Sequence, residues 1–437
     1  MAGLPSFPWM APRQPLPWCR TALARDASLQ GAVDGVARQL AGAGEADLAL
    51  VFASASFASD LPRLLPLLRQ KLQARHWLGC LGGGVVGTEA DGTARELEEE
   101  SALGVTLLRL PGATLQPFAI DTAALPDLDG PAEPWRGLLG GTTEAPTESP
   151  ESAGPQPSLL VFVDPGTTGL NDLISGLDYA YPEAVKVGGV AAAHSARHGS
   201  LLFEEEVRAG AVGCLISGGW RIEPLLAQGC RPIGPVFEVE QAQRNVVIQV
   251  SQGDERRSPV AALQTILSDL SPSEREQVRD SLFLGVARND FSLSNIGGGR
   301  TPFLVRNLIG VDPRNGAVAV GEPMRVGQKV QFQLRDGDAS RLESRQLLAD
   351  CAAAEPAPLA ALLFACLGRG RGLYGSADGD VSLCREAFAN VPIAGVFCNG
   401  EIGPVGSPTT HLHGYTASWG FLVPAAGEEP DAGAGLR

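Results

Sequence analysis

The sequence LALVFASAS (residues 48–56), continued by LPRLLPLLRQKL (61–72) and WLGCLGGGVVG (77–87), contains the pattern that decides the fold. The first and third stretches are short apolar runs of the kind found in buried strands, and the second has the apolar spacing of a helix. The third stretch ends in a run of glycines, which readily form tight turns. Together they predict a strand, a crossover helix, a second strand and a glycine turn.

This plan occurs twice more along the chain. The second copy is SLLVFVDP (158–165), LNDLISGLDYAYP (170–182) and VKVGGVAAA (185–193), and the third is ALLFACLGRG (361–370), VSLCREAFANVP (381–392) and IAGVFCNGEIGPVG (393–406). Each copy is followed by one more strand-like stretch: ALGVTLLRL (102–110), GAVGCLISG (210–218) and TASWGFLVP (416–424). Because helical crossovers between parallel strands are almost always right-handed, equivalent strand ends should meet at one edge of a sheet. Such edges commonly bind ligands.

We therefore expect an α/β protein of two modules, with mixed sheets built from repeated strand–helix–strand units and added antiparallel strands. AVAVGEP (317–323) and QKVQFQLRD (328–336) alternate as antiparallel strands do. The expected divisions are a proline-rich arm at 1–27, a first module at 28–250 with a flexible insertion at 140–158, a second module at 258–424, and a tail at 425–437.

Charge and composition exclude several classes of partner. The net charge of −15 and pI near 4.9 disfavour binding to nucleic acid or to anionic membrane surfaces. No apolar run reaches the roughly 18 residues needed to span a bilayer, and no signal peptide is evident, so we expect a cytoplasmic protein. Eight dispersed cysteines without metal-like spacing indicate reduced thiols. The familiar nucleotide-binding loops are absent from the sequence, and no cofactor is predicted.

The third copy suggests a ligand site. Two parallel strands ending together would place Cys366, Arg369, Asn399 and Glu401 around one cleft. Arg369 could hold a carboxylate and Glu401 an ammonium group, which describes a zwitterionic metabolite such as an amino acid. The alternative is an internal salt bridge between Arg369 and Glu401 that only fixes two loops.

Further candidates for this ligand site come from equivalent positions and from glycines. Asp164 ends the first strand of the second copy, where Cys366 stands in the third. Glycines at strand ends would let a ligand approach backbone amides closely, although tight packing would also require them. The remaining candidate site residues are Gly83, Gly84, Gly188, Gly189, Gly370, Gly400 and His413.

Three other interpretations stay open or are set aside. Cys366 could be the nucleophile of a cysteine-dependent enzyme, although a cysteine among apolar neighbours more often only packs. An exposed apolar arm around Trp9 and Trp18 would favour a protein-interaction scaffold. His411 and His413 share a strand face but lack a third ligand, so no metal is predicted. The acidic runs at 96–100 and 204–206 are interpreted as solvated strand edges.

The chain resembles the FIST family, whose amino- and carboxy-terminal modules are regarded as small-ligand sensors. The resemblance covers about residues 40–424. It rests on WLGCLGGGVVG, on LLVFVDP with VGGVAAA, on QGCRPIGP (228–235), on LLFACLGRG, and on FCNGEIGPVG followed by LHGYT (412–416). It implies binding of small ligands, amino acids among them, for signalling or metabolic regulation, and no established reaction. Other members carry fused F-box or signalling domains, so here we expect the output to pass to a separate signalling partner.

Overall fold

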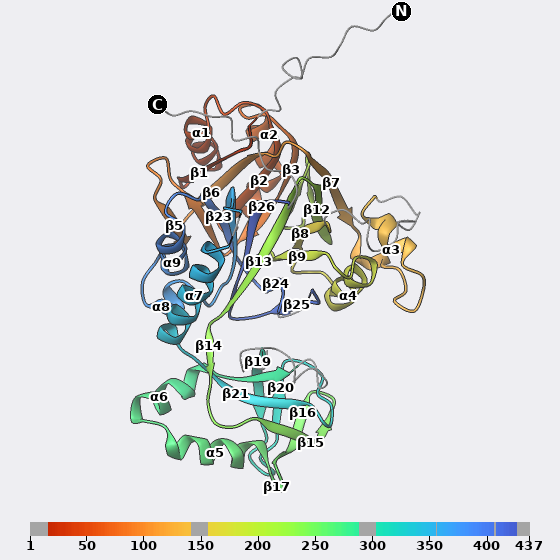
Figure 1. Ribbon diagram of the computed structural model, residues 1–437, viewed down its shortest axis with the longest axis vertical. Helices are drawn as coiled ribbons and strands as arrows, with labels where there is room; N and C mark the ends of the chain where they lie inside the picture. The colour runs from red at the N-terminus through yellow and green to blue at the C-terminus, as the bar shows by residue number, and fades with distance from the viewer. Residues whose placement is uncertain (1–15, 141–155, 288–302, 355, 406–407, 426–437) are drawn as a thin grey trace, which may run out of the picture.

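The computed structural model describes residues 16–140, 156–287, 303–354, 356–405 and 408–425. The predicted insertion at 140–158 and tail at 425–437 fall almost entirely outside these residues, as does Trp9. Figure 1 shows an upper body built around three sheets and a smaller lower body formed by a fourth. The mixed α/β class predicted from the sequence is confirmed.

The three sheets of the upper body have the same strand plan. The first sheet contains, in spatial order, β1 (Trp18–Arg25), β6 (Ala102–Arg109), β2 (Ala46–Ser54), β3 (Ala74–Gly82), β10 (Leu201–Phe203) and β11 (Glu206–Arg208). The second contains β7 (Ala113–Ile120), β12 (Ala211–Gly218), β8 (Ser158–Val163), β9 (Val185–Val190), β24 (Glu401–Pro404) and β25 (Thr410–His413). The third contains β13 (Trp220–Gln228), β26 (Thr416–Pro424), β22 (Ala360–Cys366), β23 (Ile393–Cys398), β4 (Gly84–Thr88) and β5 (Ala94–Glu98).

In each of these sheets the central pair is parallel, and the helix of the predicted strand–helix–strand unit connects its two strands. Helix α2 buries Leu61, Leu64, Leu65 and Leu68, the one-sided apolar spacing that predicted it. The helices of the upper body are α1 (Leu29–Gln39), α2 (Leu61–Arg69), α3 (Glu133–Leu138), α4 (Leu170–Ala180), α7 (Gly337–Ala352), α8 (Arg371–Tyr374) and α9 (Gly379–Ala387), with 3-10 turns η2 (Ala55–Asp60) and η3 (Thr122–Ala124).

The units exchange their hairpins in a cycle. The hairpin that follows the second unit, β10–β11, pairs with β3 of the first; β4–β5 of the first pairs with β23 of the third; and β24–β25 of the third pairs with β9 of the second. Three equivalent backbone bonds close the ring: Ala192 N to Leu81 O at 2.9 Å, Gly83 N to Phe397 O at 3.1 Å, and Asn399 N to Val190 O at 2.8 Å. The upper body therefore has approximate threefold symmetry.

Equivalent residues of the three units meet in one core. The rings of Phe52, Phe162 and Phe364 contact one another, with centroids 5.7, 5.8 and 6.4 Å apart. Each phenylalanine lies on the first strand of its parallel pair. The residue before it in the sequence stands opposite a glycine of the second strand: Gly79, Gly188 or Gly395. The repeat found in the sequence is thus the structural unit of the core.

The amino-terminal arm is shorter than the sequence predicted. Residues 18–25, assigned to the arm, form β1 and pair along its whole length with β6. Prolines at positions 12, 15 and 17 directly precede the strand and obscured its signal, although Leu23 and the alanines beside it are buried as in the other strands.

The lower body is a closed barrel, because β18 pairs both with β19 and with β21. Its strands are β15 (Phe237–Gln243), β16 (Val246–Gln252), β20 (Val318–Val320), β19 (Phe303–Val311), β18 (Leu282–Ala287) and β21 (Lys329–Arg335), extended by β14 (Cys230–Pro232) and β17 (Glu255–Arg257), with helices α5 (Pro259–Asp269) and α6 (Pro272–Ser281). The predicted antiparallel character of 317–323 and 328–336 is confirmed. No helix within the described residues has both the length and the apolar character needed to cross a membrane.

Candidate functional site

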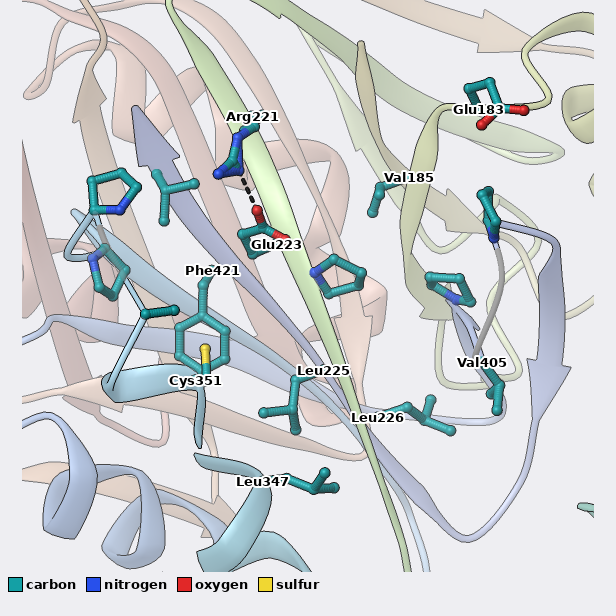
Figure 2. A pocket seen from close by; sticks show the side chains of 17 residues that line it. Glu183, Val185, Arg221, Glu223, Leu225, Leu226, Leu347, Cys351, Val405 and Phe421 are labelled. Atoms are coloured by element: carbon teal, nitrogen blue, oxygen red, sulfur yellow. Dashed lines mark hydrogen bonds and ion pairs between the residues drawn. The ribbon is translucent and has the colours of Figure 1, made fainter. Parts of the chain in front are cut away.

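A cavity of about 640 Å³ lies in the upper body, where the third unit meets the second. Its walls come from the outer strand β13, helix α7, the end of β24 and the residues that lead into β9 (Figure 2). This volume lies in the range of small-molecule sites, which are mostly apolar with a few polar groups that orient the ligand. We call it the first cavity.

Most of the lining of the first cavity is apolar. Phe421 and Val423 contribute from β26, and prolines from several segments add rigid surface that costs little entropy to order. Cys351 on α7 is half-buried, and burial raises the pKa of its thiol to about 11, so the thiol stays neutral at physiological pH. Other apolar lining residues are Leu225, Leu226, Leu347 and Val405.

Charged groups of both signs stand at one end of the first cavity. Arg221 and Glu223 lie two residues apart on β13 and form an ion pair, drawn as a dashed line in Figure 2. Their side chains are 25% and 48% exposed, so the pair is partly solvated and contributes only about 0–1 kcal/mol. Glu183 also lines the first cavity, from the segment before β9. A ligand could therefore replace this pair at little cost.

Neither Arg221 nor Glu223 is among the site residues predicted from the sequence. β13 belongs to the third unit, yet the barrel separates it from the rest of that unit along the chain. The alternation in WRIEPLLAQ puts Arg221 and Glu223 on one face of a strand, and this signal could have identified them. None of the twelve predicted site residues, all of which the structure describes, lines the first cavity.

Arg369 lies in the interior rather than in an open cleft. It is 1% exposed, and its Nε and Nη2 atoms donate to the two carboxylate oxygens of Asp380 at 2.7 and 2.6 Å. Nη2 also donates to the hydroxyls of Tyr374 and Ser340. The ion pair of Arg369 is therefore with Asp380 on α9, and the salt bridge with Glu401 considered from the sequence is not the one that forms.

Glu401 is fully buried in the core of the upper body. Its Oε2 atom accepts hydrogen bonds from the hydroxyl and the backbone N–H of Thr416 at 2.8 and 3.2 Å. Its Oε1 atom has no hydrogen bond of regular geometry, and the Cys366 thiol lies beside the carboxyl group. Burial raises the pKa of Glu401 to about 8, partly offset by the Thr416 hydrogen bonds. The equivalent positions in the other units are Val85 and Leu201.

Several predicted site residues do surround Glu401. In the sheet register, Glu401 stands between Gly189 of β9 and His413 of β25, and Gly188 faces the next residue of β24. Cys366 pairs with Cys398 across the parallel strands, and burial raises the pKa of the Cys366 thiol to about 11. Such a thiol is protonated at neutral pH and is a weak nucleophile.

The other predicted site residues have structural contacts. Asn399 and Gly83 donate two of the three backbone bonds that close the ring, and the Gly400 carbonyl accepts from the Val190 N–H at 2.8 Å. Gly84 begins β4 opposite Glu98. Asp164 accepts from the backbone N–H of Ser200 at 2.7 Å and of Gly166 at 2.9 Å. Gly370 precedes Arg371, whose N–H donates to Glu98.

One acidic run departs from its interpretation as a solvated edge. Glu96 is 2% exposed, and its Oε1 atom accepts from the Val381 N–H at 2.8 Å, at the start of α9. Burial, with the neighbouring Asp380 second, raises the pKa of Glu96 to about 8. Glu96 is buried because the hairpin exchange places β5 against the third unit, whereas Glu99 and Glu100 are exposed as expected.

These two buried carboxyls make stability depend on pH. Because the folded pKa values of Glu401 and Glu96 lie above the ordinary value near 4.5, the folded state binds their protons more tightly than the unfolded state. We expect their contribution to be fully present below about pH 4.5 and lost as the pH rises towards 8. Glu401→Gln should therefore raise the free energy of unfolding at pH 8 by a few kcal/mol. It should also reduce the change in the urea unfolding midpoint between pH 5 and 8. Exposed Glu205→Gln is the control, and an unchanged pH profile in Glu401→Gln would contradict the assignment.

No group of three or more histidine, cysteine, aspartate or glutamate side chains in the described residues is arranged to hold a metal ion. His411 and His413 have ring centroids 6.1 Å apart, and His413 Nε2 is 3.0 Å from the Gly403 carbonyl oxygen.

Comparison with known proteins gives matches along most of the chain. Residues 47–252 match the FIST N domain and residues 260–404 match the FIST C domain. An uncharacterized protein of Mycobacterium tuberculosis is 31% identical over 390 residues, covering 89% of this chain and 94% of the relative. An uncharacterized protein of Mycobacterium bovis is 31% identical over 409 residues, covering 93% and 97%. A crystal structure of a cyanuric acid hydrolase from A. caulinodans gives a TM-score of 0.28 at 10% identity, covering 94% of this chain and 100% of that one.

Proposed function

The chain belongs to the FIST family, and from this premise we propose that it is a sensor of a small zwitterion with an apolar side chain, such as an apolar amino acid. FIST domains are small-ligand-binding sensory domains of signalling proteins. The observation that carries the proposal is the first cavity, which combines an apolar interior with charges of both signs at one end.

The chemistry of an amino acid fits this arrangement. The Arg221 guanidinium can hold a carboxylate through two parallel hydrogen bonds, and Glu223 or Glu183 can accept from an ammonium group. The apolar side chain would extend over Phe421 and the leucines of β13. The sequence predicted the same ligand chemistry but assigned it to Arg369 and Glu401. Release of Arg369 from Asp380 would leave a buried carboxylate without its partner, which makes Arg221 the better carboxylate ligand.

Calorimetric titration with leucine, valine, phenylalanine and proline tests the ligand class. We expect saturable binding of at least one of them, and a ligand at 100 times its dissociation constant should add roughly 2.7 kcal/mol of stability. N-acetyl-leucine lacks the ammonium group and leucinamide lacks the carboxylate, so both should bind much more weakly than leucine if leucine is a ligand. Absence of binding across the panel would refute the amino-acid assignment.

Arg221→Gln tests the site. Loss of a hydrogen-bonded charge partner should weaken binding roughly tenfold or more. Arg208→Gln is the matched control, because Arg208 also pairs with a glutamate two residues away on a strand and lies outside the first cavity. Equal affinity in the Arg221→Gln and Arg208→Gln variants would exclude the first cavity as the site.

We also propose that the protein acts in the cytoplasm and passes its signal to a separate signalling protein. The location is supported by eight cysteines that form no disulfide, as is usual in a reducing compartment.

A further inference from the structure

The threefold plan of the upper body repeats the setting of the first cavity. The first cavity is bounded by the outer strand β13, by helix α7, by the end of the exchanged strand β24, and by the segment before β9, the strand with which β24 pairs. In the first unit the corresponding elements are β1, α1, the end of β4 and the segment before β23. A cavity of about 330 Å³ lies at that place, and we call it the second cavity.

The lining of the second cavity differs in chemistry from that of the first. Where the first has leucines, prolines and Phe421, the second presents mainly polar side chains. The polar side chains include Arg20, Gln39, Thr88, Glu89, Arg385 and Asn390. The two arginines come from different units, Arg20 from β1 and Arg385 from α9.

Neither arginine is neutralised. Among the described residues, Arg20 and Arg385 form no ion pair, and Arg20 instead lies over the Trp18 ring with its guanidinium 5.8 Å from the centroid. Arg385 donates to the carbonyl oxygens of Gly92 at 2.9 Å and Ala389 at 3.0 Å, while its Nε atom is buried without an acceptor. Carbonyl groups orient a guanidinium but leave its positive charge in place.

The carboxylate of the second cavity is already engaged. Glu89 accepts from Arg25 at 3.1 Å and lies 3.7 Å from Arg95, so two arginines outside the lining compete for its charge. The second cavity therefore holds an excess of positive charge within a chain of net charge −15. The net negative charge of the protein repels anions over most of its surface. The guanidinium groups of Arg20 and Arg385 would attract an anion locally.

We propose that the second cavity binds a small oxyanion, the carboxylate or phosphate group of a metabolite, through Arg385 and Arg20. Asn390 adds a polar group to the lining for orientation, whereas the Thr88 hydroxyl is already bonded to the Ile393 backbone and to Arg385. Its size admits a ligand of a few heavy atoms to a small dicarboxylate. This site is separate from the first cavity and does not depend on the function proposed there.

Titration calorimetry of the full chain, in a buffer free of phosphate and carboxylate, tests the proposal with sodium phosphate and sodium succinate as separate probes. We expect saturable binding of at least one probe, and the preferred probe identifies the oxyanion. Arg385→Gln should weaken that binding roughly tenfold or more. Arg38→Gln is the matched control, since Arg38 lies on α1 beside Gln39 but does not line the second cavity.

Two results would overturn the proposal: no saturable binding of either probe, or unchanged affinity in Arg385→Gln. Arg385 also holds two loop carbonyls, so this variant could lose its fold. In that event Arg20→Gln is the test variant, and unchanged affinity for the oxyanion would overturn the proposal. The Arg20 side chain is exposed and makes no hydrogen bond among the described residues, so its replacement should not affect the fold. Arg221→Gln should leave anion binding unchanged, which separates failure of this proposal from failure of the amino-acid assignment.

Discussion

Replacing Gly395 by alanine is expected to abolish the fold of the upper body. A Cβ atom at this position would lie 1.9 Å from the carbonyl oxygen of Leu363 on the neighbouring parallel strand, far inside contact distance. The clash is with backbone in a fully buried strand pair, so no side-chain rotation relieves it. We expect a loss of more than about 4 kcal/mol in the free energy of unfolding, in the range seen for severe core changes. Chemical denaturation followed by circular dichroism measures it.

The same substitution at the equivalent glycines should have the same effect. Cβ atoms at Gly188 and Gly79 would lie 1.9 and 1.8 Å from the carbonyl oxygens of Val161 and Val51. Gly137→Ala is the control, because nothing lies within 4 Å of its Cβ position and alanine favours a helix by up to about 1 kcal/mol over glycine. A Gly395→Ala variant as stable as Gly137→Ala would contradict the close packing of the parallel pair.

Arg369→Ala is expected to destabilise the protein by about 3–5 kcal/mol, the usual cost of leaving a buried charge without its partner. Asp380 is 1% exposed and would lose both hydrogen bonds to the guanidinium. If Arg369 were instead the ligand-binding arginine that the sequence predicts, its removal should abolish ligand binding without unfolding the protein. The midpoint of urea unfolding distinguishes the two expectations.

A matched exposed pair provides the control for Arg369. Arg345 also makes two hydrogen bonds to one carboxylate, that of Glu386, at 2.7 and 3.3 Å, but both side chains are about half exposed. Arg345→Ala should therefore cost far less stability than Arg369→Ala, because solvent screens the exposed pair. The double variant Arg369→Met with Asp380→Leu should be more stable than Arg369→Ala, since it buries no unpaired charge. Equal stability of Arg369→Ala and Arg345→Ala would show that the buried pair is dispensable.

The sequence predicted the repeated unit because its signals are local. Buried strands such as 48–56 show continuous apolar runs, and the crossover helix at 61–72 shows one-sided spacing, so neither depends on distant contacts. The exchange of hairpins could not be predicted in this way. A glycine turn after a strand permits the next hairpin to fold back or to cross to another unit, and the choice depends on which edge is free.

The candidate site was harder to predict for a related reason. Arg369 and Glu401 do follow apolar strands, as the sequence indicated, but each has its partner inside the fold: Asp380 on α9 for one, and Thr416 on β26 for the other. In the sequence, a charged residue that binds a ligand after a strand looks the same as one that pairs with another side chain of the fold. The signal for Arg221 lies in the alternation along β13, and the cavity beside it forms only when the second and third units come together.

The cyclic exchange of hairpins also sets an order of events during synthesis. The outer edge of the first sheet stays open until β10 and β11 emerge, with residues 201–208. The hairpin β4–β5 ends at residue 98, yet the strand it pairs with, β23, begins only at residue 393. Until then a growing chain carries a two-stranded ribbon that is marginally stable by itself and exposes strand edges that can pair with other chains. Its last sheets can close only after almost the whole chain has left the ribosome.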